Sequence, residues 1–302
     1  MTNIQIQYKA NSIELSQAET DSLLEKVEEK LFNKTFSPND HDIIAQMVES
    51  MGDTRGMTRL KFAERLGIVG KPAVPFLLEA LANHPNPVVR RASAKTLTLI
   101  ADPVAVPNLV YSLLHDEDQV VQGSCIGALA RTGEASVPEL LKIIETETNE
   151  TIKGHAAWAL AFIGKDAAEY LYQAMNSDSI DVRCAIIGAI GSVVQEQKDE
   201  KALQILLDSL KDSNPIIRSE TAAILSKINQ PSVISDLTPC LEDSDAQVRK
   251  AVALALMKIG DRNSIEYLEK ALNKESDSSI KPIFTLAINQ IKRNLEDEDD
   301  WD

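Results

Sequence analysis

The 302 residues are 44% hydrophobic but only 4% aromatic, which is typical of small close-packed helices and argues against a β-sandwich. The formal net charge of −15 argues against a nucleic-acid partner, because phosphates are bound by clustered Lys and Arg. The first residues lack the basic and apolar segments of a secretion signal, and no window approaches the ~18 uninterrupted apolar residues of a membrane span, so we expect a cytoplasmic protein without membrane insertion.

Residues 1–52 are predicted to form an N-terminal extension and a helical cap. Ser16 followed by Glu19 is a capping box, which predicts that a helix begins here. Asp40 precedes a second apolar-periodic stretch and predicts a second helix. Residues 1–15 alternate apolar and polar positions, which fits either an extended segment on the cap or a disordered one.

Residues 53–293 contain one pattern repeated eight times, with a spacing of 30 to 35 residues. Each unit has an anchor, usually basic, with Leu or Ile seven positions later and usually a branched apolar residue ten positions later. The anchors are Arg59, Arg90, Gln122, Lys153, Arg183, Arg218, Arg249 and Lys281. An earlier amphipathic stretch makes each unit a helical hairpin, and such hairpins bury their apolar faces only when they stack. We therefore predict an all-α fold, a right-handed α-solenoid of about eight HEAT-like helical hairpins.

Turn residues recur at fixed places in these units. Prolines suit the first turn of the first helix, and they are Pro75, Pro107 and Pro138. Side chains that cap the second helix stand four residues before an anchor, and they are Asn86, Asp118, Asn149, Asn214, Asp245 and Asp277. Glycines eleven residues after an anchor suit a left-handed helix end, and they are Gly70, Gly133, Gly164 and Gly260. We expect the anchor bases to bridge to acids of neighbouring turns as a structural ladder.

Positions two, five and nine after each anchor form one stripe of the second helix, distinct from the core positions four, seven and ten. In a solenoid this stripe lines the concave surface, where a protein partner would lie. The fourth unit places an aromatic pair there, beside small residues that would let a flat group approach. The predicted concave site comprises Ser124, Gly127, Arg131, His155, Trp158, Phe162, Arg183 and Gly188. The alternative is that Trp158 fills the core between two glycine-containing helices.

Residues 294–302 form an acidic tail. Six of the last seven residues are acidic, and Trp301 lies among them. A run of acids is usually a solvated end, but Trp301 adds an apolar contact of the kind that short linear motifs use. The tail is therefore a second candidate contact, suited to a basic groove.

The repeat units resemble the HEAT-like repeats of the phycobilisome bilin lyase family over residues 53–293. The resemblance is carried by units such as Asp-Ala-Gln-Val-Arg-Lys-Ala-Val-Ala-Leu-Ala-Leu-Met-Lys-Ile-Gly at residues 245–260. It implies attachment, isomerisation or removal of a linear tetrapyrrole on a cysteine of an antenna protein, whose own thiol is the nucleophile. Trp158 and Phe162 would then stack on the bilin, and Arg131 or Arg183 would meet its propionates. The segment at residues 154–164 also resembles part of a HEAT-repeat protein that is a partner of A-type iron–sulfur carriers.

No independent catalytic constellation accompanies this pattern. None of the four histidines precedes a glutamate, which excludes the di-iron site of deoxyhypusine hydroxylase, and no phosphate loop or metalloprotease motif occurs. Cys125, Cys184 and Cys240 fit neither a disulfide framework nor metal-ligand spacing, and are read as core-filling residues. The residues thus indicate no catalytic group, no metal and no resident cofactor, with a bilin as the ligand that the resemblance implies.

Two functions remain open from the sequence. The favoured hypothesis is a protein-binding scaffold or chaperone-like factor that assists phycobiliprotein or iron–sulfur protein maturation, with a phycobiliprotein subunit or an iron–sulfur carrier as partner. The alternative is a phycobilin lyase, isomerase or bilin-detachment factor that acts on a cysteine of an antenna protein. A metal or cluster carrier that uses the cysteines is a third reading.

Overall fold

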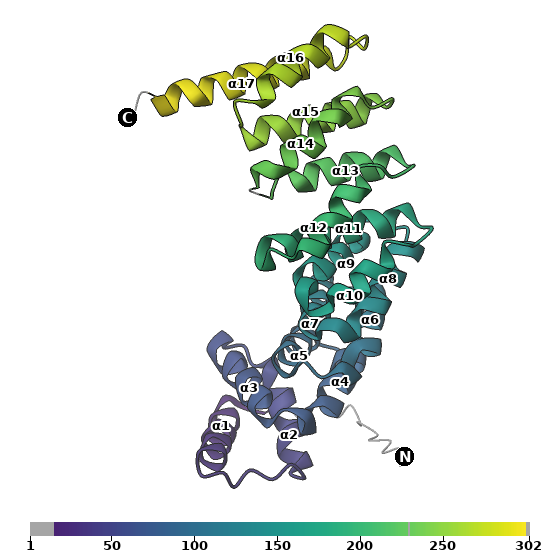
Figure 1. Ribbon diagram of the computed structural model, residues 1–302. Coiled ribbons are helices and arrows are strands. Elements are labelled where there is room, and N and C mark those ends of the chain that lie inside the picture. The colour runs from purple at the N-terminus through teal and green to yellow at the C-terminus, as the bar shows by residue number, and fades with distance from the viewer. Residues whose placement is uncertain (1–14, 229, 300–302) are drawn as a thin grey trace. The chain divides into compact units, whose positions relative to one another are not determined.

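The computed structural model describes residues 15–228 and 230–299, and every regular element in this part of the chain is a helix (Figure 1). The chain divides into two compact units, one formed by Met1–Ile143 with Thr148–Ala159 and the other by Ile144–Glu147 with Leu160–Asp302. Helices α8 and α9 contribute residues to both. The predicted all-α class is confirmed.

The N-terminal cap consists of α1 (Gln17–Phe32), α2 (His41–Glu49) and a 3-10 turn, η1 (Ser50–Gly52). The capping box is formed as predicted, because the Ser16 hydroxyl accepts the Glu19 N–H at 3.3 Å and the Glu19 carboxylate accepts the Ser16 N–H at 2.8 Å. Residues 1–14, which include most of the alternating stretch, lie outside the described residues.

The repeat helices follow in chain order, and the first of each later pair is often preceded by a 3-10 turn. They are α3 (Gly56–Val69), α4 (Val74–Asn83), α5 (Pro87–Ile100), α6 (Val106–His115), α7 (Gln119–Arg131), α8 (Val137–Thr146), α9 (Glu150–Ile163), α10 (Ala168–Ala174), α11 (Ile180–Gln197), α12 (Glu200–Ser209), α13 (Pro215–Leu225), α14 (Ile234–Leu237), α15 (Ala246–Ile259), α16 (Ser264–Lys274) and α17 (Lys281–Asp299). Helix α14 is short because Pro239, which lacks an N–H, lies in the 3-10 turn η7 (Thr238–Glu242) that follows it.

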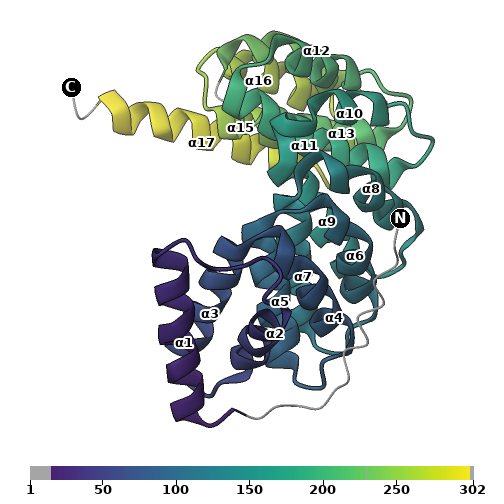
Figure 2. The ribbon, with the colours of Figure 1, turned by 90° about the horizontal axis from the view of Figure 1, so that it is seen from below.

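Second helices of successive hairpins pack on one another within each unit (Figures 1 and 2). In the first unit α3 contacts α5 and α5 contacts α7; in the second, α11, α13, α15 and α17 contact one another in that order. The residue seven positions after every anchor is buried, from Leu66 with 0% exposure to Ile288 with 6%. Position seven of the predicted core stripe is therefore confirmed, whereas positions four and ten are buried in only some units, and Thr285, at position four of the last unit, is exposed.

Turn chemistry largely follows the prediction. The four predicted glycines all have positive φ, and the three prolines lie at the second residue of α4, α6 and α8. Asn86, Asp118, Asn149, Asn214 and Asp245 accept N–H groups of the helices they precede. Asp277 differs, because it accepts the N–H of Ser279 in a turn before α17 begins.

Four of the five anchor arginines form the expected ladder, with one arrangement that recurs, whereas Arg59 donates to the Asp53 and Thr54 carbonyls of its own turn. Arg249 donates from Nε and Nη2 to the two oxygens of Glu275 at 2.7 and 2.8 Å, and from Nη1 to the carbonyl of Asp243 at 2.8 Å. Glu275 also accepts the N–H of Asp277 at 2.8 Å. The equivalent ion pairs are Arg90–Asp116, Arg183–Asp212 and Arg218–Asp243. Gln122 keeps only the link to its own turn, by donating to the Asp116 carbonyl.

Candidate functional site

The aromatic pair of the predicted site is exposed. Trp158 and Phe162 lie four residues apart on α9, and each exposes 52% of its surface. The interpretation of Trp158 as a core residue is therefore wrong. The prediction of a solvent-facing stripe is confirmed in this unit, since His155 is exposed as well, whereas Leu160 and Ile163, at positions seven and ten after the same anchor, are buried. Large exposed aromatics of this kind are the usual anchors of interfaces.

The site residues fall into two groups, because α9 belongs partly to each unit. Five lie in the first unit, and they are Ser124, Gly127, Arg131, His155 and Trp158. The other three lie in the second unit, and they are Phe162, Arg183 and Gly188. That the two groups act together stays a prediction.

In the first group, α7 presents an open surface. A Cβ built on Gly127 would meet no heavy atom within 4 Å, so the backbone is accessible at this point. Arg131 is the exposed last residue of α7, where a positive charge is favoured by the helix dipole. The Ser124 hydroxyl donates to the Val120 carbonyl at 2.8 Å, so its proton is already used within the helix. His155 is exposed on α9, three residues before Trp158.

In the second group, Gly188 and Arg183 differ in character. Gly188 is as open as Gly127, with no atom within 4 Å of a built Cβ. Arg183 exposes only 17% of its side chain and forms an ion pair with Asp212. A propionate contact through Arg183 would have to break this ladder pair, so Arg183 is a structural residue at the start of α11 rather than an available ligand.

Sequence reasoning missed two residues of this surface. Gly123 and Gly154 also have no atom within 4 Å of a built Cβ. They stand four residues before Gly127 and Trp158, and residues four apart share a helix face. Their four-residue spacing could therefore have identified them from the sequence. The two glycines extend the open backbone by one turn on α7 and on α9.

The cysteines are poor nucleophiles. Burial, with a smaller contribution from Asp116, raises the pKa of the Cys125 thiol to about 12, and burial with Glu220 raises the pKa of Cys184 to about 11. Burial also raises the pKa of Cys240. All three therefore hold their protons near neutral pH. Cys125 is fully buried as predicted, whereas the other two are half-buried.

Within residues 15–228 and 230–299, no three His, Cys, Asp or Glu side chains are grouped so as to hold a metal ion. No helix in these residues is both long enough and apolar enough to cross a membrane.

Comparison with known proteins connects this architecture to a family. The family model for HEAT repeats matches residues 74–161, 137–223 and 205–289, which confirms the predicted HEAT solenoid. The chain is 38% identical to the bilin biosynthesis protein MpeU of Synechococcus over 298 residues, covering 97% of this chain and 100% of that protein. It is 25% identical to the uncharacterized phycocyanin operon protein Z of Pseudanabaena tenuis, covering 69% of this chain and 91% of that one.

Among solved structures, the complex of CpcE and CpcF of phycocyanin lyase from Nostoc is similar with a TM-score of 0.34 and 17% identity, covering 85% of this chain and 95% of that chain. Because the identity with MpeU extends over nearly the whole of both chains, the protein belongs to the HEAT-repeat family that includes this bilin biosynthesis protein.

Proposed function

We propose that the protein is a bilin lyase or isomerase that holds a linear tetrapyrrole while it reacts with a cysteine of an antenna protein. The observation that carries the proposal is the 38% identity with MpeU across 97% of this chain. It favours the lyase alternative over the scaffold that the sequence alone favoured. The iron–sulfur partner stays a prediction from the resemblance.

In this proposal the reacting thiol comes from the client protein. The three cysteines of this chain have raised pKa values and stay protonated near neutral pH, so none is suited to attack the bilin. Addition of a client thiol across an exocyclic double bond of the bilin forms one C–S bond and transfers the thiol proton to the adjacent carbon. The reaction balances without an oxidant, so the role of this chain is to bind and orient both reactants.

The first-unit group has the chemistry to hold a bilin. The exposed face of Trp158 offers a stacking surface for a planar conjugated ring. The open backbone at Gly127 allows close approach, and the exposed Arg131 suits the carboxylate of a propionate. His155, exposed on the same helix as Trp158, adds a hydrogen-bonding group.

Replacing Trp158 with Ala is expected to lower bilin transfer about fivefold or more, because aromatic stacking on one planar ring contributes about 1 to 3 kcal/mol. The measurement is coexpression with a bilin and an apo antenna subunit, followed by quantification of covalently coloured subunit on a denaturing gel. Tyr111→Ala is the matched control, since Tyr111 is an aromatic residue on α6 with 63% exposure. It should transfer bilin like the unchanged protein.

The outcomes of this experiment separate function from site. If the unchanged protein neither colours nor bleaches any antenna subunit, the proposed function is wrong. If it does so and Trp158→Ala is equally active, the function stands but the site lies elsewhere.

Replacing Gly127 with Ala is expected to stabilise the protein and still reduce transfer. A Cβ meets nothing within 4 Å, so Ala should raise the free energy of unfolding by about 0.5 to 1 kcal/mol through helix propensity. The added methyl would hold the bilin plane away from α7. Urea unfolding and the transfer assay are measured together, so a loss of transfer cannot be attributed to unfolding.

Gly56→Ala is the control for this variant, because Gly56 is the first residue of α3, outside the site, and its Cβ would meet Arg59 Nη2 at 3.6 Å, an ordinary contact. It should not lower the free energy of unfolding and should keep the transfer. Equal transfer by Gly127→Ala and the unchanged protein would remove Gly127 from the site.

A further inference from the structure

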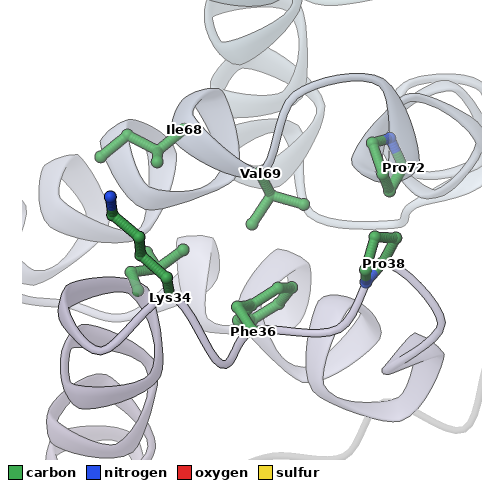
Figure 3. A pocket seen from close by; sticks show the side chains of 7 residues that line it. Lys34, Phe36, Pro38, Ile68, Val69 and Pro72 are labelled. Carbon is green, nitrogen blue, oxygen red and sulfur yellow. The ribbon is translucent and has the colours of Figure 1, made fainter.

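A small cavity lies in the first unit, away from Trp158. It is formed by the loop between α1 and α2, the end of α3 and the turn after it, and its volume is about 270 Å³. The lining residues are Leu31, Lys34, Phe36, Pro38, Ile68, Val69 and Pro72. Figure 3 shows Phe36, Pro38, Val69 and Pro72 around a common space, with Lys34 and Ile68 at one edge. A cavity just below the usual range of about 300 to 1,000 Å³ suits one aromatic side chain rather than a tetrapyrrole.

The surface beside this cavity is also apolar. Ile68 exposes 63% of its surface and Leu99 exposes 60%. The two helices touch here, because a Cβ on Gly67 would lie 3.1 Å from Leu99 Cδ1. The cavity and these side chains together make an apolar shelf on α3 and α5 that can bury an incoming residue.

The surroundings of the shelf are basic in a chain that is acidic as a whole. Residues 59–99 contain seven basic and two acidic residues, although the whole chain carries −15. Three of the basic residues are paired with acids outside this range, Arg65 with Glu28, Arg90 with Asp116 and Lys71 with Asp102. Lys34, Lys61 and Lys95 are exposed, and the side chain of Lys71, beside Pro72, is 84% exposed. An apolar pocket with this rim fits a ligand that combines an aromatic ring with several carboxylates.

The C-terminal segment of the chain has that composition. Six of residues 296–302 are acidic and the seventh is Trp301, which lies outside the described residues. Helix α17 ends at Asp299 with no basic residue in its last turn. Acidic side chains at a helix C-terminus are disfavoured by the helix dipole, and a basic partner relieves this repulsion.

We propose that the cavity receives Trp301 of a second copy of the chain, with the flanking carboxylates against Lys34, Lys71 and Lys95. The indole fills the apolar space and the charges orient the segment. The pocket and the segment are different surfaces, so the contact is heterologous and links copies head to tail. This inference is independent of bilin chemistry.

Fluorescence anisotropy tests the contact with a labelled peptide of residues 294–302. The receptor is the full chain with Trp301→Ala, which leaves the pocket intact and disables its own segment. Binding should be saturable and should weaken at least about tenfold with Ile68→Glu or Lys34→Glu in the receptor, or with Trp301→Ala in the peptide. Ile216→Glu is the control, because Ile216 is an isoleucine on α13 with 56% exposure, and it should leave binding unchanged.

Two further measurements complete the test. Raising salt from about 0.1 M to about 1 M shortens the Debye length from about 10 Å to about 3 Å and should weaken peptide binding strongly. Sedimentation of the full chain should show association that rises with concentration and disappears in Ile68→Glu. Peptide binding that is insensitive to Ile68→Glu, or a full chain that stays monomeric at every concentration, would overturn the proposal.

Discussion

Replacing Glu275 with Gln is expected to lower the free energy of unfolding at neutral pH by about 3 kcal/mol. Glu275 is only 7% exposed, and it accepts two hydrogen bonds from Arg249 and one from the N–H of Asp277. Gln keeps the shape of the side chain but removes its charge, so the guanidinium of Arg249 loses its ionic partner in a nearly buried position. Urea unfolding of the two proteins at neutral pH measures the difference.

The stabilisation that Glu275 contributes is expected to depend on pH. The hydrogen bonds from Arg249 lower the pKa of Glu275 from 4.5 to about 2. Because the pKa in the folded state lies below that in the unfolded state, the stabilisation is complete above about pH 4.5 and is lost as the pH falls toward 2. The unchanged protein and Glu275→Gln should therefore converge over this range. A difference in stability that stays constant from neutral pH to about pH 2 would contradict the assignment.

Glu266→Gln is the control for both measurements. Glu266 accepts from Lys270 at 2.6 Å on the same helix, but both side chains are largely exposed. Exposed pairs contribute little, because water screens the charges. The urea midpoint of this variant should not change measurably at either end of the pH range.

The fold was predictable because its signals are local and repeat. Eight residues at one spacing from their anchors are all buried, and each glycine predicted to end a helix has positive φ. A single capping residue or glycine would have been weak evidence for a helix end, but recurrence at a common spacing makes chance agreement improbable. The positions of the acids in the ladder were harder to predict, since Asp116 and Glu275 stand two residues before Asp118 and Asp277, the residues that the repeat marks as caps. Only the structure shows that each of these acids accepts both the N–H of the residue two positions later and the side chain of the anchor arginine in the preceding unit.

The candidate site was predictable in part. Helical periodicity was sufficient to place Trp158 on the exposed stripe, because it depends only on spacing within one helix. It could not show that Arg183 is engaged by Asp212, which lies 29 residues later in the next hairpin. Nor could it find the cavity between Phe36 and Pro72, since loop conformation and the approach of distant segments create that space.

Two glycines of α11, Gly188 and Gly191, are expected to change the free energy of unfolding in opposite directions when each is replaced with Ala. A Cβ on the buried Gly191 would lie 2.4 Å from Ile224 Cγ2, where α11 packs on α13. That methyl group is attached directly to a branched Cβ, so only a change of χ1 or a shift of the helix can move it away. Gly191→Ala should therefore lower the free energy of unfolding by about 2 to 3 kcal/mol.

Gly188→Ala provides the matched comparison, because nothing lies within 4 Å of its Cβ and helix propensity should raise the free energy of unfolding by about 0.5 to 1 kcal/mol. Urea unfolding of both variants measures the two changes. Stabilisation by both would mean that α11 and α13 separate at little cost, and the close contact at Gly191 would then not hold these hairpins together. Opposite signs would show that Gly191 is needed for the packing of α11 on α13, whereas Gly188 is not needed for packing. Reduced bilin transfer by the stabilised Gly188→Ala variant would then assign Gly188 to the site rather than to the fold.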